Sequence, residues 1–363
     1  QYGSVHNDSF YAAAMWSDGS ILLASESEGL AGDSPFTWNV TKFDVNGTWL
    51  WEWKNDDEDL EIWWHLNDAG VGEDGSVGLA GGGLTSPHIV KIGAGGELEW
   101  ESEDCDQKPQ GLVMQGDGSL VIGGTRKISD GNSGDFAACK LDSTKNGVVV
   151  STWEGGTNSY DSCSVAVLGD NDSVILAGQT FGDWEGEWLG GRDFAAVKLG
   201  NNLTEIWRWQ GGTEEDDSFS GGGVGDNGSV ILVGSTYGDW ANSNQGGEDF
   251  AAVKLNTTDG SMLWKWQGGT NGTDRLVGAA LGDEGTVFLG GFTTGLWGDV
   301  YAGGIDFAGV LLNLNDGTEL CRWQNGTEKD DIALDVAGGY DGLVVLAGIT
   351  QGNWSQANHG GND

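Results

Sequence analysis

Asparagines that precede a hydroxyl residue by two positions are the most distinctive chemical feature of this sequence. Ten of its 22 asparagines begin an Asn-x-Ser/Thr sequon, the acceptor for N-linked glycan, whereas its Ser and Thr content predicts about three by chance. Asn-Gly-Ser/Thr is also ordinary turn chemistry, which accounts for some of these sites. The excess still predicts an exported, N-glycosylated protein. The acceptors are Asn7, Asn39, Asn46, Asn171, Asn202, Asn227, Asn256, Asn271, Asn325 and Asn353.

The four cysteines follow no C-x-x-C metal or redox spacing. Cys105 and Cys163 lie near the start of equivalent segments in adjacent repeat units, which predicts a disulfide between them in an oxidising compartment. Cys139 replaces the valine of a repeated "FAAVK" segment, and Cys321 replaces a tryptophan of another. Both are interpreted as core substitutions.

Four tryptophans lie in polar loops, within "GDW", "GDW", "GLW" and "GNW". A ring of exposed indoles is typical of surfaces that stack on sugars, because an indole offers a flat apolar face. The alternative is that each indole anchors its own long loop to the fold, and this is the favoured interpretation. The residues are Trp184, Trp240, Trp297 and Trp354.

Paired aspartates bracket three successive glycine-rich loops. Carboxylate oxygens in flexible loops suit calcium, the one cofactor that the sequence leaves open. None of the pairs follows the D-x-[DN]-x-[DN]-G spacing, so caps on backbone amides are the favoured interpretation. The pairs are Asp183 with Asp193, Asp239 with Asp249, and Asp299 with Asp306.

No catalytic pattern accompanies these residues. The four histidines have no metal-ligand spacing, and no G-x-S-x-G motif occurs. The 56 acidic and 16 basic residues give a net charge of -40, which would repel nucleic acid and anionic membranes. No apolar run approaches the roughly 18 residues of a membrane helix. The sequence therefore predicts a non-enzymatic protein that neither binds nucleic acid nor inserts into a membrane.

Short strands must position these residues, because the chain has 66 glycines and almost no helical periodicity. A "GSxxLAG"-like segment starts near residues 20, 76, 119, 173, 229, 286 and 342, a period of about 56 residues, and each copy follows an Asp/Asn/Gly turn. Such turns join the two strands of a hairpin. "DFAAVKL" at 193–199 and 249–255, with relatives at 135–141 and 306–312, adds a third strand, and a Trp-rich segment adds a fourth.

One unit is thus four antiparallel strands, a to d, at 164–168, 173–177, 194–199 and 205–210 in the fourth repeat. Repeated four-stranded units of this length are typical of propeller blades, which hide their apolar faces against each other. We predict one all-β domain over residues 1–363, a β-propeller of seven blades. The seventh has strands a and b but lacks c and d, which predicts an open ring.

An unpaired strand edge is normally covered in folded proteins. Two sources are predicted for the missing pair: a continuation of the natural chain, or a neighbouring molecule that adds strands and links rings into a fibre. A copy of this chain or another protein is therefore the expected partner.

The units "GQTFGDWEGEWLGGRDFAAVKL" and "GSTYGDWANSNQGGEDFAAVKL" resemble SBBP-type β-propeller repeats, which implies an extracellular or cell-surface protein. The expected role is a structural or protein-interaction module, including a subunit of a surface filament. A lectin-like propeller is the alternative. A second alternative is a quinoprotein-like enzyme, because "LNTTDGSMLWKW" at 255–266 resembles the docking repeats of such propellers.

Overall fold

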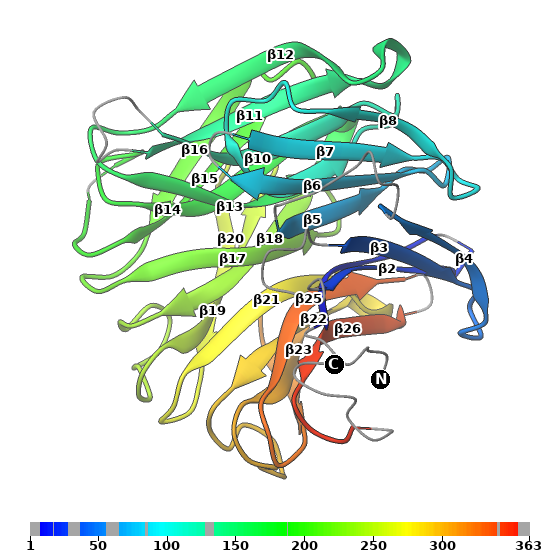
Figure 1. Ribbon diagram of the computed structural model, residues 1–363. Coiled ribbons are helices and arrows are strands. Elements are labelled where there is room, and N and C mark those ends of the chain that lie inside the picture. The colour runs from blue at the N-terminus through cyan, green and yellow to red at the C-terminus, as the bar shows by residue number, and fades with distance from the viewer. Residues whose placement is uncertain are drawn as a thin grey trace.

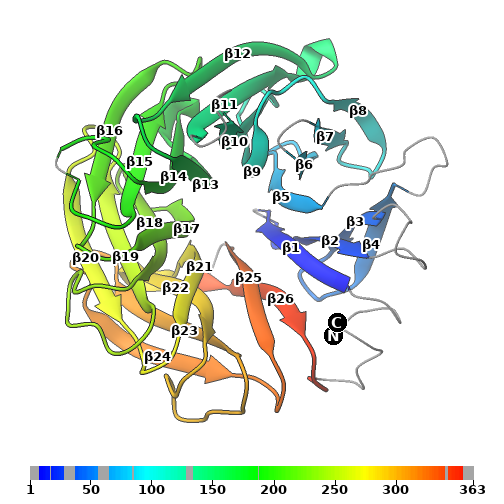
Figure 2. The same ribbon diagram turned by 60° about the vertical axis from the view of Figure 1, so that its left-hand side comes forward.

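The computed structural model describes residues 8–16, 18–27, 37–55, 65–83, 86–127, 134–186, 188–339 and 342–354. These residues form seven antiparallel sheets that follow one another around a ring (Figures 1 and 2). Six sheets have four strands, and we number them blades 1 to 6 in chain order. The remaining two-stranded sheet, here called the seventh sheet, lies between blades 6 and 1. The predicted all-β propeller is confirmed.

The strand bounds follow the predicted repeat closely. Blades 1 to 3 consist of β1 (Asp8–Met15), β2 (Ile21–Ser27), β3 (Thr37–Phe43), β4 (Trp49–Lys54), β5 (Leu66–Val71), β6 (Val77–Gly83), β7 (Ser86–Ile92), β8 (Leu98–Ser102), β9 (Lys108–Met114), β10 (Leu120–Lys127), β11 (Gly134–Asp142) and β12 (Val148–Gly155). Blades 4 to 6 consist of β13 (Asp161–Leu168), β14 (Val174–Thr180), β15 (Asp193–Leu199), β16 (Glu205–Gly211), β17 (Asp217–Val224), β18 (Ser229–Thr236), β19 (Asp249–Asn256), β20 (Met262–Gly268), β21 (Asp274–Leu281), β22 (Thr286–Thr293), β23 (Asp306–Asn313) and β24 (Glu319–Asn325). The seventh sheet consists of β25 (Asp331–Gly338) and β26 (Val344–Thr350), and 3-10 turns span Ser143–Lys145, Asp170–Asp172 and Asp283–Gly285.

Each inner strand carries a one-residue β-bulge, which bends the strand and re-aims a side chain. All seven bulged residues line one cavity on the ring axis. They are Tyr11, Asn67, Gln110, Ser164, Ser220, Val277 and Leu334. The seven bulges therefore lie at the same level of the channel, where all seven sheets border it.

The repeated "FAAVKL" strand belongs to two hydrophobic cores at once. In β15, Phe194 and Ala196 pack toward blade 5, whereas Val197 and Leu199 on the other face pack toward blade 3. Alternate residues of a strand point to opposite faces, so one short segment seals both neighbouring junctions. This explains why the chain repeats the segment with so little change.

In blades 4 and 5 the lysine of this strand ties the blade to the next one. In β15 the buried Lys198 donates to Asp170 in its own blade and, at 2.8 Å, to the carbonyl of Thr257 in the c–d turn of blade 5. Lys254 bonds in the same way to Asp226 and to the carbonyl of Leu314 in blade 6. A buried ammonium needs such partners, because leaving it unpaired is costly. Sequence reasoning missed this contact.

Candidate functional site

The outer edge of the seventh sheet is the main departure from the repeat. In complete blades the second strand is covered on both sides, and β18 is buried along its whole length. In β26, by contrast, only Ala347 and Thr350 are buried. Val344, Val345 and Leu346 are half-buried, although the equivalent residues of β18 are fully buried. The structure thus leaves the β26 edge without a third strand among the described residues.

An apolar groove of about 230 Å³ runs along this edge between blades 6 and 1. Its walls come from blade 1, from β26 and from Phe307 of blade 6. Apolar surface exposed in a groove of this kind is typical of an interaction site. The lining residues outside β26 are Phe10, Leu23, Phe307 and Trp354.

In blades 4 to 6 the loop tryptophan is buried rather than exposed. Trp184, Trp240 and Trp297 have 4, 7 and 3% of their surface exposed. Each packs against the phenylalanine that starts the third strand of the preceding blade. Because stacking on a sugar needs an open ring face, these three residues do not offer the predicted sugar platform. Loop anchoring, the favoured interpretation, is what the structure shows here.

The outer strand holds each of these loops through a glutamine. In blade 4, Gln210 accepts from the backbone N–H of Trp184 at 2.7 Å and donates to Asp193 at 2.7 Å. Its amide also donates to the carbonyl of Gly182 at 3.1 Å. Arg208 of the same strand lies over the indole, 4.8 Å from its centroid. Blades 5 and 6 repeat this Gln–Asp–loop clasp through Gln267 and Gln324.

Trp354 in the seventh sheet is the exception, with 37% of its surface exposed. It keeps the inter-blade contact, since its ring lies 5.2 Å from that of Phe307. The described part of the seventh sheet has no outer strand to supply the glutamine and the cation. The half-exposed indole therefore marks the place where a complete blade would have its third and fourth strands.

Most predicted glycan acceptors lie on exposed turns. Turns between strands a and b and between c and d emerge on one face of the ring, and the other connections emerge on the opposite face. Both faces carry exposed acceptors, while Asn256 is half-buried and Asn7 lies outside the described residues. The exposed acceptors are Asn46, Asn171, Asn202, Asn227, Asn271, Asn325 and Asn353.

Asn39 corrects the sequence-based prediction. Its sequon falls in the strand β3 rather than in a turn, and the residue is buried. The Nδ2 atom, which would carry a glycan, donates to Glu52 at 2.9 Å. A glycan on this atom has no path to solvent in the folded blade, so we expect Asn39 to be unmodified.

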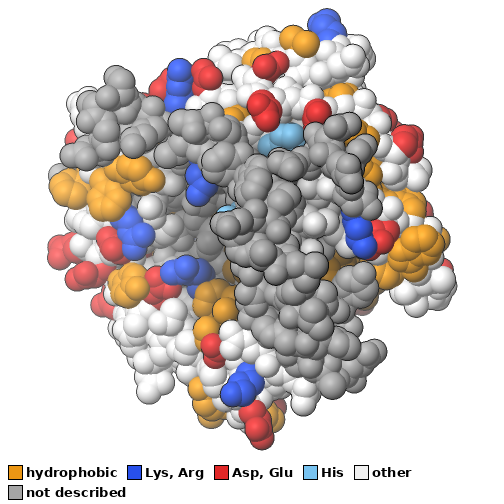
Figure 3. Space-filling view, in the orientation of Figure 1, with side chains coloured by type: hydrophobic (Ala, Val, Ile, Leu, Met, Phe, Trp, Pro, Cys, Tyr) orange, Lys and Arg blue, Asp and Glu red, His pale blue; other side chains and the backbone are white. Residues whose placement is uncertain are grey.

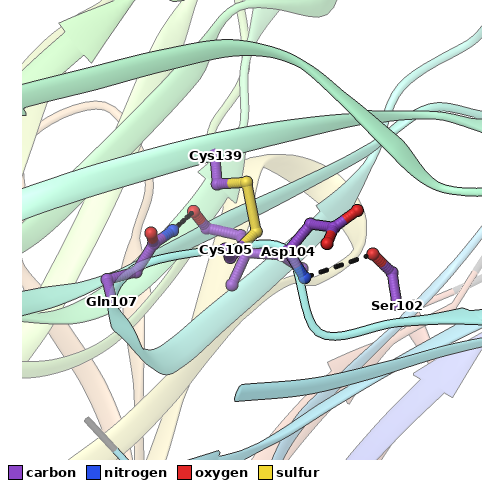
Figure 4. Close-up of a disulfide and its surroundings, with 6 residues drawn as sticks. Ser102, Asp104, Cys105, Gln107 and Cys139 are labelled. Carbon is purple, nitrogen blue, oxygen red and sulfur yellow. Dashed lines mark hydrogen bonds between the residues drawn. A yellow bond between two sulfur atoms is a disulfide. The ribbon is translucent and has the colours of Figure 1, made fainter. Parts of the chain in front are cut away.

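The predicted pairing of Cys105 with Cys163 is wrong. Cys105 lies before β9 and forms a disulfide with Cys139 of β11, with their Cα atoms 5.9 Å apart (Figure 4). Cys163 lies inside β13, buried in the junction between blades 3 and 4, and its thiol donates to the carbonyl of Val165. The prediction failed because equivalent positions in the repeat do not show which way the Cys105 and Cys163 side chains point. Cys321, predicted to be a core residue, is exposed on the outer strand β24.

The cysteines are expected to separate cleanly in a labelling experiment. Burial raises the pKa of Cys163 to about 12, so its thiol reacts slowly, whereas Cys321 is exposed. Treatment of the folded protein with iodoacetamide should modify Cys321 alone, and Cys163 should react only after denaturation. Peptide mapping without reduction should recover a Cys105–Cys139 link. A Cys105–Cys163 peptide would contradict the assignment.

The loop aspartates cap backbone amides. Asp183 accepts from Trp188 at 2.9 Å, and Asp239 accepts from Asn244 at 2.8 Å. Asp193 accepts from Leu189 as well as from the clasp glutamine. Within the described ranges no three His, Cys, Asp or Glu side chains, Asp299 included, lie close enough together to hold a metal ion. Calcium binding, the alternative to these caps, is not tested.

Two half-buried aspartates that line the channel each link one inner strand to the adjacent one. Asp68 accepts from the backbone N–H of Leu112 in blade 3 at 2.7 Å, and Asp335 accepts from Ala13 in blade 1 at 2.6 Å. Burial, together with the charge of Asp335, raises the pKa of Asp68 to about 8, and burial raises that of Asp335 to about 7. The second contact joins the seventh sheet to blade 1, so the inner strands close the ring even though the outer part of the seventh sheet is open.

Comparison with known proteins supports the fold and nothing finer. No family model matches the chain, and no curated protein matches it. The chain is similar in structure to the WD40 domain of Neurospora crassa Pan2 (TM-score 0.56, 11% identity, 94% of this chain and 86% of that one). It is also similar to the WD40 propeller of Doa1 (0.57, 14%, 94% and 90%) and to the propeller of the Trilobed protease from Pyrococcus furiosus, described as having an open velcro topology (0.54, 9%, 97% and 92%). The chain therefore has a β-propeller fold, a scaffold that serves many functions.

No helix in the described residues has the length and apolar character needed to span a membrane.

Proposed function

We propose that this protein is an exported, N-glycosylated β-propeller that serves as a non-enzymatic structural and protein-interaction module at or outside the cell surface. The observation that carries the proposal is the placement of the acceptor asparagines, seven of which are exposed on turns or at a strand end of the ring. Sugars on exposed turns cause no packing conflict. The Cys105–Cys139 disulfide supports an oxidising compartment. Membership of the SBBP-type repeats and a place in a surface filament belong to the same proposal.

The charge distribution agrees with a soluble, well-separated module. Figure 3 shows acidic and basic side chains interspersed on the visible face of the described residues. With a net charge of -40, copies of the protein repel each other unless a specific contact joins them. A specific, shape-defined contact is therefore the kind of association that we propose.

Glycosylation is expected to be visible in the mass of protein purified from its natural source. At least five acceptors should carry glycan, which places the intact mass well above the 38.1 kDa polypeptide, and enzymatic removal of N-glycans should restore the lower value. Glycopeptide mapping should show Asn39 unmodified as the internal control. Sedimentation of the native material should show it in an assembly larger than one chain. A native mass near 38.1 kDa would refute the proposal.

The half-exposed Trp354 favours a second candidate function, that of a lectin-like propeller. A glycan array probed with the wild-type chain and with Trp354→Ala tests it. Sugar binding that depends on Trp354 would support the lectin, and its absence would leave the interaction module.

A further inference from the structure

The five junctions from blades 1 and 2 to blades 5 and 6 share a contact. The junction between blade 6 and the seventh sheet lacks it. At each of the five junctions, the third or outer strand of one blade bonds to the c–d turn of the following blade. The bonds, here called the turn clamp, run from Trp51 to Ala94, from Lys91 to Ser143, from Lys140 and Ser151 to Asn201 and Asn202, from Lys198 and Trp207 to Thr257, and from Lys254 and Trp264 to Leu314.

Blade 6 has lost both halves of the turn clamp. Leu311 occupies the position of Lys254, and Cys321 occupies the position of Trp264, since the two pair across β23 and β24 as Lys254 and Trp264 pair across β19 and β20. Leu311 is half-buried and Cys321 is exposed. The chain thus ties the c–d turns of blades 2 to 6 to the preceding blade, whereas blade 6 lacks the lysine and tryptophan that would clamp a c–d turn of the seventh sheet.

Blade 1 shows the complementary gap. Phe10 occupies the position that Phe219 has in blade 5, since each residue immediately precedes the bulged residue of its inner strand. Phe219 is covered by Phe194 from the third strand of blade 4, with ring centroids 4.4 Å apart, and is 1% exposed. Phe10 is only half-buried and faces the groove. A phenylalanine in a third strand of the seventh sheet would stack on it in the same way.

The seventh sheet already has the conformation that accepts a third strand. Gly352 donates to the hydroxyl of Thr350 at 3.1 Å, as Gly182 donates to Thr180 at 3.1 Å in blade 4. Trp354 sits on Phe307 as Trp184 sits on Phe136. Because these groups are ordered before the strands arrive, little ordering cost opposes docking.

A complete c–d pair is longer than any stretch of the chain outside the described residues. The c–d pair of blade 4 spans 19 residues, from Asp193 to Gly211. The stretches outside the described residues at the two ends, 1–7 and 355–363, hold seven and nine residues. The described c–d pairs of a second copy are all built into that copy's own blades. Neither the end stretches, by their length, nor the described pairs of a second copy, by their place in its blades, offer a free c–d pair.

We propose that the seventh sheet is the docking site for a β-hairpin of a partner polypeptide. The hairpin has the chemistry of the chain's own c–d pairs: a strand beginning with Asp-Phe that pairs with β26, and an outer strand ending in Gln that clasps the Trp354 loop. The Phe stacks on Phe10, and the hairpin's turn lies against Leu311 and Cys321 without a turn clamp. A junction without that clamp suits a hairpin that arrives separately. The proposal rests on the proposed interaction role and names its partner.

A synthetic hairpin tests the proposal with the chain as it exists. The probe is a peptide with the sequence of residues 248–268, titrated calorimetrically into the 363-residue protein. Saturable binding at one peptide per chain is expected, with a rise in melting temperature, because a ligand of the folded state stabilises that state. A peptide with Phe250→Asp and a chain with Phe10→Ala should each bind about tenfold or more weakly. As a control, a chain with Leu263→Ala, an exposed change on the outer strand of blade 5, should bind the unchanged peptide like the wild-type chain.

Disulfide exchange at Cys321 tests where the turn of the docked hairpin lies. The peptide carries Thr257→Cys as a mixed disulfide with an aromatic thiol. The Cys321 thiolate attacks the peptide sulfur, a new disulfide forms, and the aromatic thiolate leaves, so no further oxidant is needed. A covalent one-to-one adduct is expected with the wild-type chain. Cys321→Ser should give none, and adding Phe250→Asp to the peptide should slow the reaction.

Three results would overturn the proposal. One is the lack of saturable binding, or equal binding of the Phe250→Asp peptide. Another is concentration-dependent self-association of the chain alone that Phe10→Ala abolishes, since a second copy would then cover the edge. The third is a native polypeptide that carries its own c–d pair on the seventh sheet. Each leaves the glycan-mass experiment intact, so failure of the hairpin is distinguishable from failure of the proposed function.

Discussion

Replacement of Trp240 by alanine is expected to lower the free energy of unfolding by about 3–5 kcal/mol. The indole is 7% exposed and lies between Phe194 of blade 4 and Lys265 of its own blade, with its centroid 5.3 Å from the Phe194 ring. Its removal leaves a cavity at a junction that the neighbouring strands cannot close, because both are fixed in their own sheets. Denaturant unfolding followed by circular dichroism measures the change.

Trp354→Ala is the matched control, since Trp354 has the same place in the repeat. It is 37% exposed and has one aromatic neighbour, so its loss should cost about 1 kcal/mol. Equal losses for the two variants would contradict the anchoring role. Unchanged stability of Trp240→Ala with lost sugar binding would instead identify the loop tryptophans as a lectin site.

The repeat predicted the blades because two local signals agree at every copy. Asp-Gly and Asn-Gly turns fix the hairpins, and the observed second strands begin at Ile21, Val174 and Ser229, within two residues of the predicted positions. Alternation in "FAAVKL" identified a segment with two apolar faces. Both signals act over a few residues, and local backbone chemistry is what a single sequence encodes most directly.

Contacts between blades could not be predicted, because they join residues that are far apart in the chain. The Lys198 ammonium reaches Thr257, 59 residues away, and the only trace in the sequence is that Asp170 and Asp226 each precede their lysine by 28 residues. The disulfide prediction was wrong for the same reason. Cys105 and Cys163 share a place in the repeat, but the partner of Cys105 is Cys139. Asn39 shows a different limit, since a sequon does not report whether its asparagine lies in a turn or a strand.

The free energy of unfolding is expected to fall as the pH rises from about 4 to about 8. Burial raises the pKa values of Asp68, Asp335 and Asp217 to about 8, 7 and 6, above the ordinary value of 3.8. In this range the folded protein therefore holds protons that the unfolded chain releases. A group whose folded pKa is raised stabilises the fold below its unfolded pKa, and this stabilisation is lost as the pH passes through the folded pKa.

The opposite sign applies below about pH 4. Hydrogen bonds from Lys145 and Thr144 lower the pKa of Asp142 to about 2, and a serine hydroxyl lowers that of Asp74. Stabilisation by such groups is present above their unfolded pKa and is lost on acidification. Because the two sets of aspartates act in opposite directions, maximum stability should lie near pH 4. The net charge of -40 strengthens the alkaline limb, since repulsion grows as the last carboxyls ionise.

Melting temperatures at a series of pH values test the channel aspartates directly. Each pKa unit is worth about 1.4 kcal/mol, so Asp68 and Asp335 together account for several kcal/mol at most. Asp68→Asn and Asp335→Asn should each flatten the slope between pH 5 and 8, whatever they do to the melting temperature at acidic pH. Asp259→Asn, which removes an exposed carboxylate, should keep the wild-type slope. A double channel variant with that same slope would show that the two carboxyls do not hold the protons, and the alkaline loss would then belong to the repulsion among surface charges.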